Sequence, residues 1–152
     1  MPLYTVGRSA FTLSSAADSL TICSSAKPLR IMIADFKGLA VASSANEVIM
    51  YRATTAGSSL ASGGITPAPV NSGSAAAAFT VYTVFGSSLE STAGAVMWRF
   101  GVNGNGGQDK FVSLPGGEIS MPSSSYMGFR SSTGVSGAGV ATANLFIEEV
   151  DG

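Results

Sequence analysis

The feature that most constrains the fold is a run of short segments rich in β-branched and aromatic residues, separated by clusters of Gly, Ser, Pro and Asn. Such segments are typical of β-strands bounded by turns. No segment keeps a helical period over three turns, and the one candidate helix, residues 14–19, is too short to stand alone and is interpreted as a turn. The pattern predicts strands at residues 4–8, 20–24, 29–36, 47–53, 79–85, 96–102, 110–113, 118–121, 126–131 and 140–149.

The last predicted strand alternates cleanly between apolar and polar residues, as a strand with one buried face must. One face carries Ala141, Ala143, Leu145 and Ile147, and the other carries Thr142, Asn144 and Glu148. About ten such strands in 152 residues predict an all-β fold, an antiparallel, jelly-roll-like β-sandwich of about eight to ten strands. We expect a single domain over residues 1–152, because this length suits one core.

A long Gly/Pro/Ala/Ser-rich loop is predicted at about residues 54–78. A structureless stretch of this length inside a domain is uncommon and is usually functional or disordered. Its centre is biased toward an extended, polyproline-like backbone, because each proline restricts its neighbour. The loop is therefore either an arm that docks on another subunit or a plain surface loop. The candidate interface residues in it are Ile65, Pro67, Pro69 and Val70.

Charged residues are scarce. The chain has 8 Lys and Arg and 9 Asp and Glu, which is 11% of its residues, against about 25% in typical soluble domains. A surface so poor in charge favours association, so we expect neighbouring chains to cover part of it, although abundant Ser and Thr can also keep such a surface hydrated. The cations are scattered singly, which argues against nucleic acid or an anionic membrane as the main partner.

Cys23 is the only cysteine, so an intrachain disulfide is excluded. Its place in an apolar strand-like run favours a small buried side chain over a reactive thiol. The sequence carries no signal-peptide pattern and no apolar stretch of the roughly 18 residues that a membrane helix needs. We therefore expect the protein to be made and kept in a cytosol-like compartment, or to leave it without a signal.

No enzyme is predicted, and no catalytic, cofactor-binding or metal-binding residue is expected. The chain has no histidine, which removes the commonest general base and zinc ligand. Residues 134–138 lack the final glycine of a nucleophile elbow, and residues 103–109 fit a hairpin turn better than a calcium loop. Glu148 and Glu149 are adjacent on one strand and so lie on opposite faces. The remaining carboxylates leave a glycosidase-like pair open: Asp18, Asp35, Glu47, Glu90, Asp109 and Glu118.

Trp98 is the only tryptophan, in a segment whose alternation groups it with Val96 and Phe100. We interpret it first as a core residue, because aromatic side chains dominate core burial. The alternative is an interface anchor, since Trp, Tyr and Arg are the residue types that dominate binding energies. The same two interpretations apply to Tyr51 and Tyr82, and Arg99 joins Tyr82 and Trp98 as a candidate interface residue.

Several features recur in a fixed order: an opening strand at 4–8 followed by Ser/Thr/Ala, a strand at 29–36, a small-residue turn into 48–53, the Gly/Pro/Ala-rich excursion, Trp98-Arg99-Phe100, and the segments 114–119 and 144–149. Over nearly the whole chain this order resembles small decoration, or cement, proteins and related minor structural proteins of tailed bacteriophages. The resemblance lies in order and composition, without one specific motif.

The resemblance implies a jelly-roll-like sandwich that forms homotrimers and binds the outer capsid surface, where it bridges neighbouring major capsid protein subunits and stabilises the shell. The protein would be made in the host cytoplasm and end on the virion. Two alternatives stay open. One is a trimeric phage adhesin, a glycan-binding module in which an exposed aromatic residue stacks on sugar. The other is a hydrolase that uses Asp and Glu alone.

Overall fold

The computed structural model describes residues 1–13, 18–24, 26–39, 45–53, 62–84, 96–103, 106–132 and 139–150. These residues contain no helix that is long and apolar enough to cross a membrane. They form twelve strands: β1 (Leu3–Thr12), β2 (Leu20–Ser24), β3 (Leu29–Gly38), β4 (Ala45–Ala53), β5 (Ser62–Ile65), β6 (Ala68–Pro69), β7 (Phe79–Val84), β8 (Val96–Asn103), β9 (Gln108–Val112), β10 (Ile119–Met121), β11 (Tyr126–Ser131) and β12 (Val140–Glu149).

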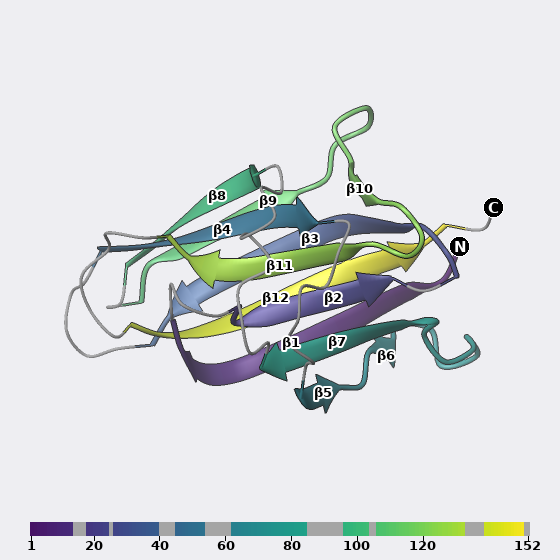
Figure 1. The fold of residues 1–152 in the computed structure, drawn as a ribbon, viewed down its shortest axis with the longest axis horizontal. Helices are drawn as coiled ribbons and strands as arrows, with labels where there is room; N and C mark the ends of the chain where they lie inside the picture. The colour runs from purple at the N-terminus through teal and green to yellow at the C-terminus, as the bar shows by residue number, and fades with distance from the viewer. Residues whose placement is uncertain are drawn as a thin grey trace.

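The strands form two antiparallel sheets that pack face to face, which confirms the predicted all-β sandwich (Figure 1). Sheet A runs in the order β10-β3-β12-β1-β6, and β9 also pairs with β3. Sheet B runs in the order β5-β7-β2-β11-β4-β8. All ten predicted strands are present, and β5 and β6 lie inside the stretch that was predicted to be a loop.

The strand pairing is nested in the manner of a jelly roll. If β5, β6 and β7 are left out and β9 and β10 are counted as one element, eight elements remain in chain order. The first of them pairs with the last, β1 with β12. The second pairs with the seventh, β2 with β11, the third with the sixth, β3 with β9 and β10, and the fourth with the fifth, β4 with β8. The insertion of β5 to β7 therefore lies between the fourth and fifth elements.

The core lies between the sheets, and its centre is aromatic. Phe36 of sheet A packs against two rings of sheet B, with centroids 4.9 Å from Phe100 and 5.5 Å from Phe129. The alternation predicted for β12 is confirmed, because Ala141, Ala143, Leu145 and Ile147 are all fully buried. Small residues of β12 thus leave room for the large rings.

The outer side of sheet B carries a smaller buried cluster of Ile49, Tyr51 and Ala53. Strand β4 is therefore buried on both faces, since Val48 and Met50 point into the core. Gly128 on the adjacent strand β11 faces the Tyr51 ring so closely that a Cβ atom there would lie 2.6 Å from it. A side chain at residue 128 would displace the tyrosine.

Candidate functional site

The structure divides the seven candidate interface residues between opposite edges of the sandwich. Strands β5 and β8 are the two ends of sheet B. Trp98 and Arg99 lie on β8. The other five lie on or beside β5, β6 and β7: Ile65, Pro67, Pro69, Val70 and Tyr82. We call the first the Trp98 edge and the second the arm edge, after residues 62–78, which we call the arm. The seven residues therefore do not form one site.

At the arm edge the chain crosses from one sheet to the other. Strand β5 pairs with β7 at the end of sheet B, and β6 pairs with β1 at the end of sheet A. Ile65 packs against the main core, and Pro67 is buried. Val70, by contrast, is 53% exposed. The arm thus closes its own sandwich. The earlier part of the predicted loop, residues 54–61, lies outside the described residues.

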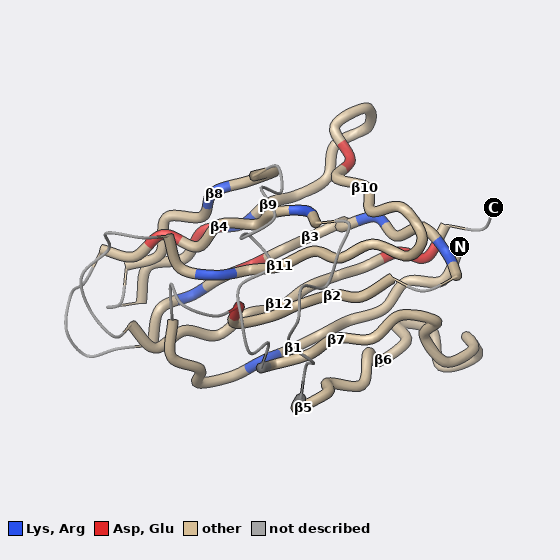
Figure 2. Tube along the Cα trace, in the orientation of Figure 1, with Lys and Arg blue, Asp and Glu red and all other residues tan. Residues whose placement is uncertain are grey.

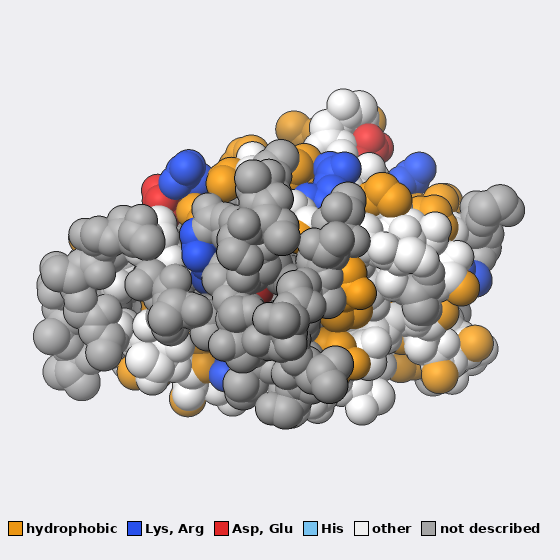
Figure 3. All heavy atoms as spheres, in the orientation of Figure 1, with side chains coloured by type: hydrophobic (Ala, Val, Ile, Leu, Met, Phe, Trp, Pro, Cys, Tyr) orange, Lys and Arg blue, Asp and Glu red, His pale blue; other side chains and the backbone are white. Residues whose placement is uncertain are grey.

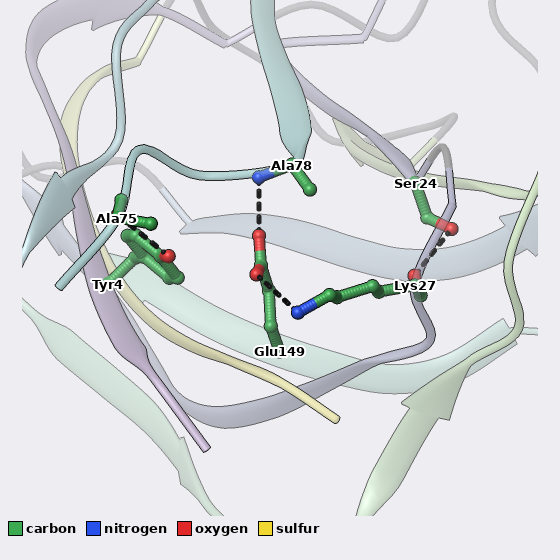
Figure 4. Close-up of polar contacts among 6 residues, drawn as sticks. All are labelled: Tyr4, Ser24, Lys27, Ala75, Ala78 and Glu149. Atoms are coloured by element: carbon green, nitrogen blue, oxygen red, sulfur yellow. Dashed lines mark hydrogen bonds and ion pairs between the residues drawn. The ribbon is translucent and has the colours of Figure 1, made fainter. Parts of the chain in front are cut away.

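Two buried side chains at the chain ends hold the last part of the arm (Figure 4). The Tyr4 hydroxyl donates a hydrogen bond to the Ala75 carbonyl oxygen at 3.0 Å. The Ala78 amide donates to Oε1 of Glu149 at 2.5 Å, and Nζ of Lys27 lies 3.9 Å from Oε2 of the same carboxylate. Glu149 is only 2% exposed, so these contacts offset the cost of burying its charge.

Arg8 adds a further contact between the layers at this edge. Its guanidinium donates to the carbonyl oxygens of Ser19 and, at 2.9 Å, of Thr83 on β7. The same group lies 4.7 Å from the centre of the Phe11 ring. Burial lowers the pKa of Arg8, but an arginine keeps its charge in proteins. Arg8 therefore acts as a charged link between β1 and sheet B.

At the Trp98 edge, apolar side chains reach the surface. Among the described residues seven large apolar side chains are exposed, and four of them lie on β8, on β9 or in the loop after β9: Val96, Trp98, Val112 and Leu114. Figure 3 shows apolar side chains beside basic ones along the upper rim, where β8 and β9 run. Contiguous exposed apolar surface is a common mark of a binding site.

Trp98 is 42% exposed, so its interpretation as a core residue is wrong. It does lie on the face of β8 that it shares with buried Phe100, as alternation predicted, and its ring packs edge-on against Phe111 of β9 with centroids 5.2 Å apart. Because β8 is the last strand of sheet B, none of the described strands pairs with it on its other side. The ring thus packs against Phe111 on one side while part of it stays exposed.

The neighbouring side chains make a shallow hollow of about 370 Å³ lined by Val96, Met97, Trp98 and Arg99. Arg99 donates to Oε1 of Glu47 at 2.7 Å, and both side chains are exposed enough to meet a partner. The Trp98 edge therefore combines an aromatic ring held in place with a charged pair. This mixture is typical of residues that dominate binding at interfaces.

Among the described residues, no three Asp, Glu or Cys side chains gather in a way that could hold a metal ion. Asp18 is buried and accepts hydrogen bonds from the Tyr51 hydroxyl and from Thr21 at 3.4 Å. Asp109 accepts the Gly101 amide at 2.9 Å, and Glu118 is exposed on the loop before β10. Glu90, residues 104–105 and residues 134–138 lie outside the described residues.

Cys23 lies on β2, half-buried beside the cluster around Tyr51. Burial raises the pKa of its thiol to about 11, so the thiol is protonated near neutral pH. A protonated thiol is a poor nucleophile.

The charged residues of the molecule are few and dispersed along the chain (Figure 2). Comparison with known protein families, with curated proteins and with solved structures finds no match. The site therefore has to be judged on its own chemistry.

Sequence reasoning missed two parts of these edges. It named neither Val112 nor Leu114, although an exposed apolar pair beside a Trp-bearing strand is a recognisable signal once the pairing is known. It also gave Glu149 no role beyond its face. In the sequence, Glu149 appears only as a polar residue at the position where the alternation of β12 predicts an apolar one.

Proposed function

We propose that this protein is a structural component of a bacteriophage virion, a decoration protein that binds the outer capsid surface and bridges major capsid protein subunits. The observation that carries the proposal is the Trp98 edge: exposed Val96, Trp98, Val112 and Leu114 on a sandwich of low charge. The jelly-roll-like fold is suited to a small protein that bridges neighbouring subunits. The resemblance of nearly the whole chain to cement proteins is the reason for proposing the capsid as its partner.

The stabilisation would arise by mass action on the assembled shell. A protein that binds only the assembled form stabilises it by RT ln(1 + [L]/Kd), about 2.7 kcal/mol per site at a hundredfold excess over Kd. If one molecule or oligomer holds several seams at once, effective concentration multiplies the effect. Modest contacts at each Trp98 edge then suffice to bridge subunits.

The test uses undecorated shells assembled from the major capsid protein encoded with this chain. Purified protein should sediment with the shells and raise their melting temperature. Trp98→Ala should weaken both effects, whereas Leu39→Ala, which alters an apolar side chain of similar exposure elsewhere (46%), should leave them unchanged. Failure of the unaltered protein to bind or stabilise the shells would refute the proposal.

A second function has one observation in its favour. Trp98 and Arg99 both line the hollow, and Arg99 forms an ion pair with Glu47. An aromatic ring beside polar groups is suited to binding a sugar. The protein would then be a phage adhesin. Binding on a glycan array that Trp98→Ala abolishes, together with no capsid binding, would favour the adhesin. A silent array would count against it.

A further inference from the structure

The outer face of sheet A carries a row of one threonine and three apolar residues that lie opposite one another across four strands, and we call it the apolar row. Thr5 of β1 lies opposite Phe146 of β12, Phe146 lies opposite Ile33 of β3, and Ile33 lies opposite Val112 of β9. These residues alternate with fully or largely buried neighbours such as Leu145, so their side chains point away from the core. Ala68 of β6 pairs with Thr5 and extends the row.

This row is unusual for a sheet face that meets water. Antiparallel sheets with one solvated face generally place polar residues on that face, yet here the central positions are Phe146 and Ile33, both only partly buried. Val112 at the end of the row is 45% exposed. An apolar stripe over the three adjacent strands β12, β3 and β9 indicates that another surface covers it.

The rows on either side of the stripe carry balanced charges. Two residues along β12 from Phe146, Glu148 pairs across the sheet with Arg30, and their charged atoms lie 3.7 Å apart. Two residues in the other direction, Asn144 pairs with Asp35, and Asp35 pairs with Lys110 of β9. Each of these two rows thus holds one positive and one negative side chain, so the rows beside the stripe are neutral, and Lys37 lies one row further along β3.

The charges are placed so that a second copy of the sheet, turned by 180°, presents opposite charges to the first. Arg30 and Asp35 lie on the same strand, β3, on opposite sides of Ile33. If a second molecule is turned by 180° about an axis along the apolar row, its flanking rows exchange places. Arg30 then faces Asp35 of the other copy twice over, Glu148 faces Asn144, and the apolar row packs on itself.

The face is large enough for such contact. Strands β1, β3 and β12 have ten residues each, which span about 33 Å, and with β9 they are about 19 Å wide. Even in projection this is comparable with the ~800 Å² that each partner contributes to a standard interface. Two sheets packed with their strands nearly aligned are also a common arrangement in β-proteins.

We propose that the outer face of sheet A binds the same face of a second copy of this chain about a two-fold axis along the row Thr5, Phe146, Ile33 and Val112. The inference does not depend on the capsid. It differs from the threefold association that the resemblance to cement proteins implies. It covers Val112 of each Trp98 edge but leaves Val96 and Trp98 on β8 at the outside of both copies, so that one dimer presents two such strands.

The first test is the mass of the purified chain by light scattering after size exclusion. We expect twice the 15.3 kDa of one chain. Ile33→Glu should give single chains, because it places two carboxylates in the middle of the apolar contact. Glu118→Arg, which changes the charge of an exposed side chain on the loop before β10, should keep the mass of two. A mass of one chain or of three for the unaltered protein overturns the two-fold arrangement.

The sharper test uses charge reversal. Arg30→Asp makes both facing positions acidic and Asp35→Arg makes both basic, so each variant alone should dimerise at least about tenfold more weakly. An equimolar mixture should recover the dimer, because each acidic position then meets a basic one. No recovery on mixing overturns the proposed opposition of Arg30 and Asp35. Loss of capsid binding by Ile33→Glu in a protein that is monomeric throughout would instead assign this face to the shell.

Discussion

The two edges of the sandwich solve the same problem in opposite ways. A terminal strand exposes unpaired backbone groups and the side of the core. At the arm edge, the short terminal strands β5 and β6 pair with β7 and β1, Pro67 is buried, and Tyr4 and Glu149 hold the chain that follows. At the Trp98 edge the aromatic side chain itself covers the gap and stays 42% exposed. The difference indicates that the arm serves the fold and that the Trp98 edge is free for a partner.

The largest expected effect tests whether Trp98 belongs to the core, by comparing substitutions at two residues on the same face of β8. Phe100→Ala should lower the free energy of unfolding by about 3–5 kcal/mol, because it leaves a cavity beside Phe36. Trp98→Ala should cost only about 1–2 kcal/mol, since it gives up partial burial and one ring contact. Chemical denaturation measures both. Equal losses would mean that Trp98 belongs to the core after all.

The next largest effect is expected at the arm edge. Glu149→Ala leaves the Ala78 amide without its acceptor and should cost about 1–3 kcal/mol. Hydrogen exchange at Ala78 should accelerate as well. The neighbouring substitution Glu148→Ala removes an ion pair with Arg30 on the outer face and should cost less than about 1 kcal/mol. If the two substitutions proved equivalent, Glu149 would not be what holds the arm.

Tyr4→Phe is a milder change at the same edge. It removes the hydroxyl that donates to the Ala75 carbonyl oxygen but keeps the ring, whose centroid lies 5.5 Å from that of Phe79. We expect a loss of about 1 kcal/mol in thermal or chemical unfolding, with faster proteolysis of the arm. An unchanged protein would show that the hydrogen bond to Ala75 contributes nothing.

Cys23 lies on β2, an inner strand of sheet B between the two edges, and the effect expected there is the smallest. Its pKa is raised to about 11 in the folded protein, while an unfolded cysteine titrates near ~8.5. Between these values the unfolded chain releases a proton that the folded chain keeps, so stability should fall as pH rises. Because the thiol is half-buried, the change should stay below about 1 kcal/mol. Denaturation from pH 8 to 11 of the unaltered protein and of Cys23→Ala measures this contribution as the difference between their free energies of unfolding. Stability profiles that run parallel over this range would contradict the prediction.

The strands were predictable because alternation is a local property. The apolar positions 141, 143, 145 and 147 of β12 already indicate which of its side chains meet in the core. In β3 the register shift beside Ile33 breaks this alternation, so that Ile31 is buried while Ile33 lies on the outer face. Strands β5 and β6 escaped prediction because Gly63, Gly64 and Pro69 offer no alternating apolar pattern. They pair through backbone groups, and backbone groups leave no mark in the sequence.

The candidate site was predicted less well, for a related reason. Alternation assigned Trp98 to the correct face of β8 but gave no information on how far the opposite sheet extends beneath it. Burial at an edge depends on strand order, which only the pairing of β4 with β8 reveals. For the same reason the row formed by Thr5, Phe146, Ile33 and Val112 cannot be read from four segments that are far apart in the chain.

The pairing of the first strand with the last has a consequence for the connectivity of the chain. Leu3 lies directly opposite Glu148, and both chain ends lie at the same end of the sandwich (Figure 1). A short linker joining them would turn this most distant pair into a hairpin, and the exposed turn at Pro115 and Gly116 offers a place to open new ends. Such a circular permutant would have a lower contact order and should fold faster without any change in the folded core.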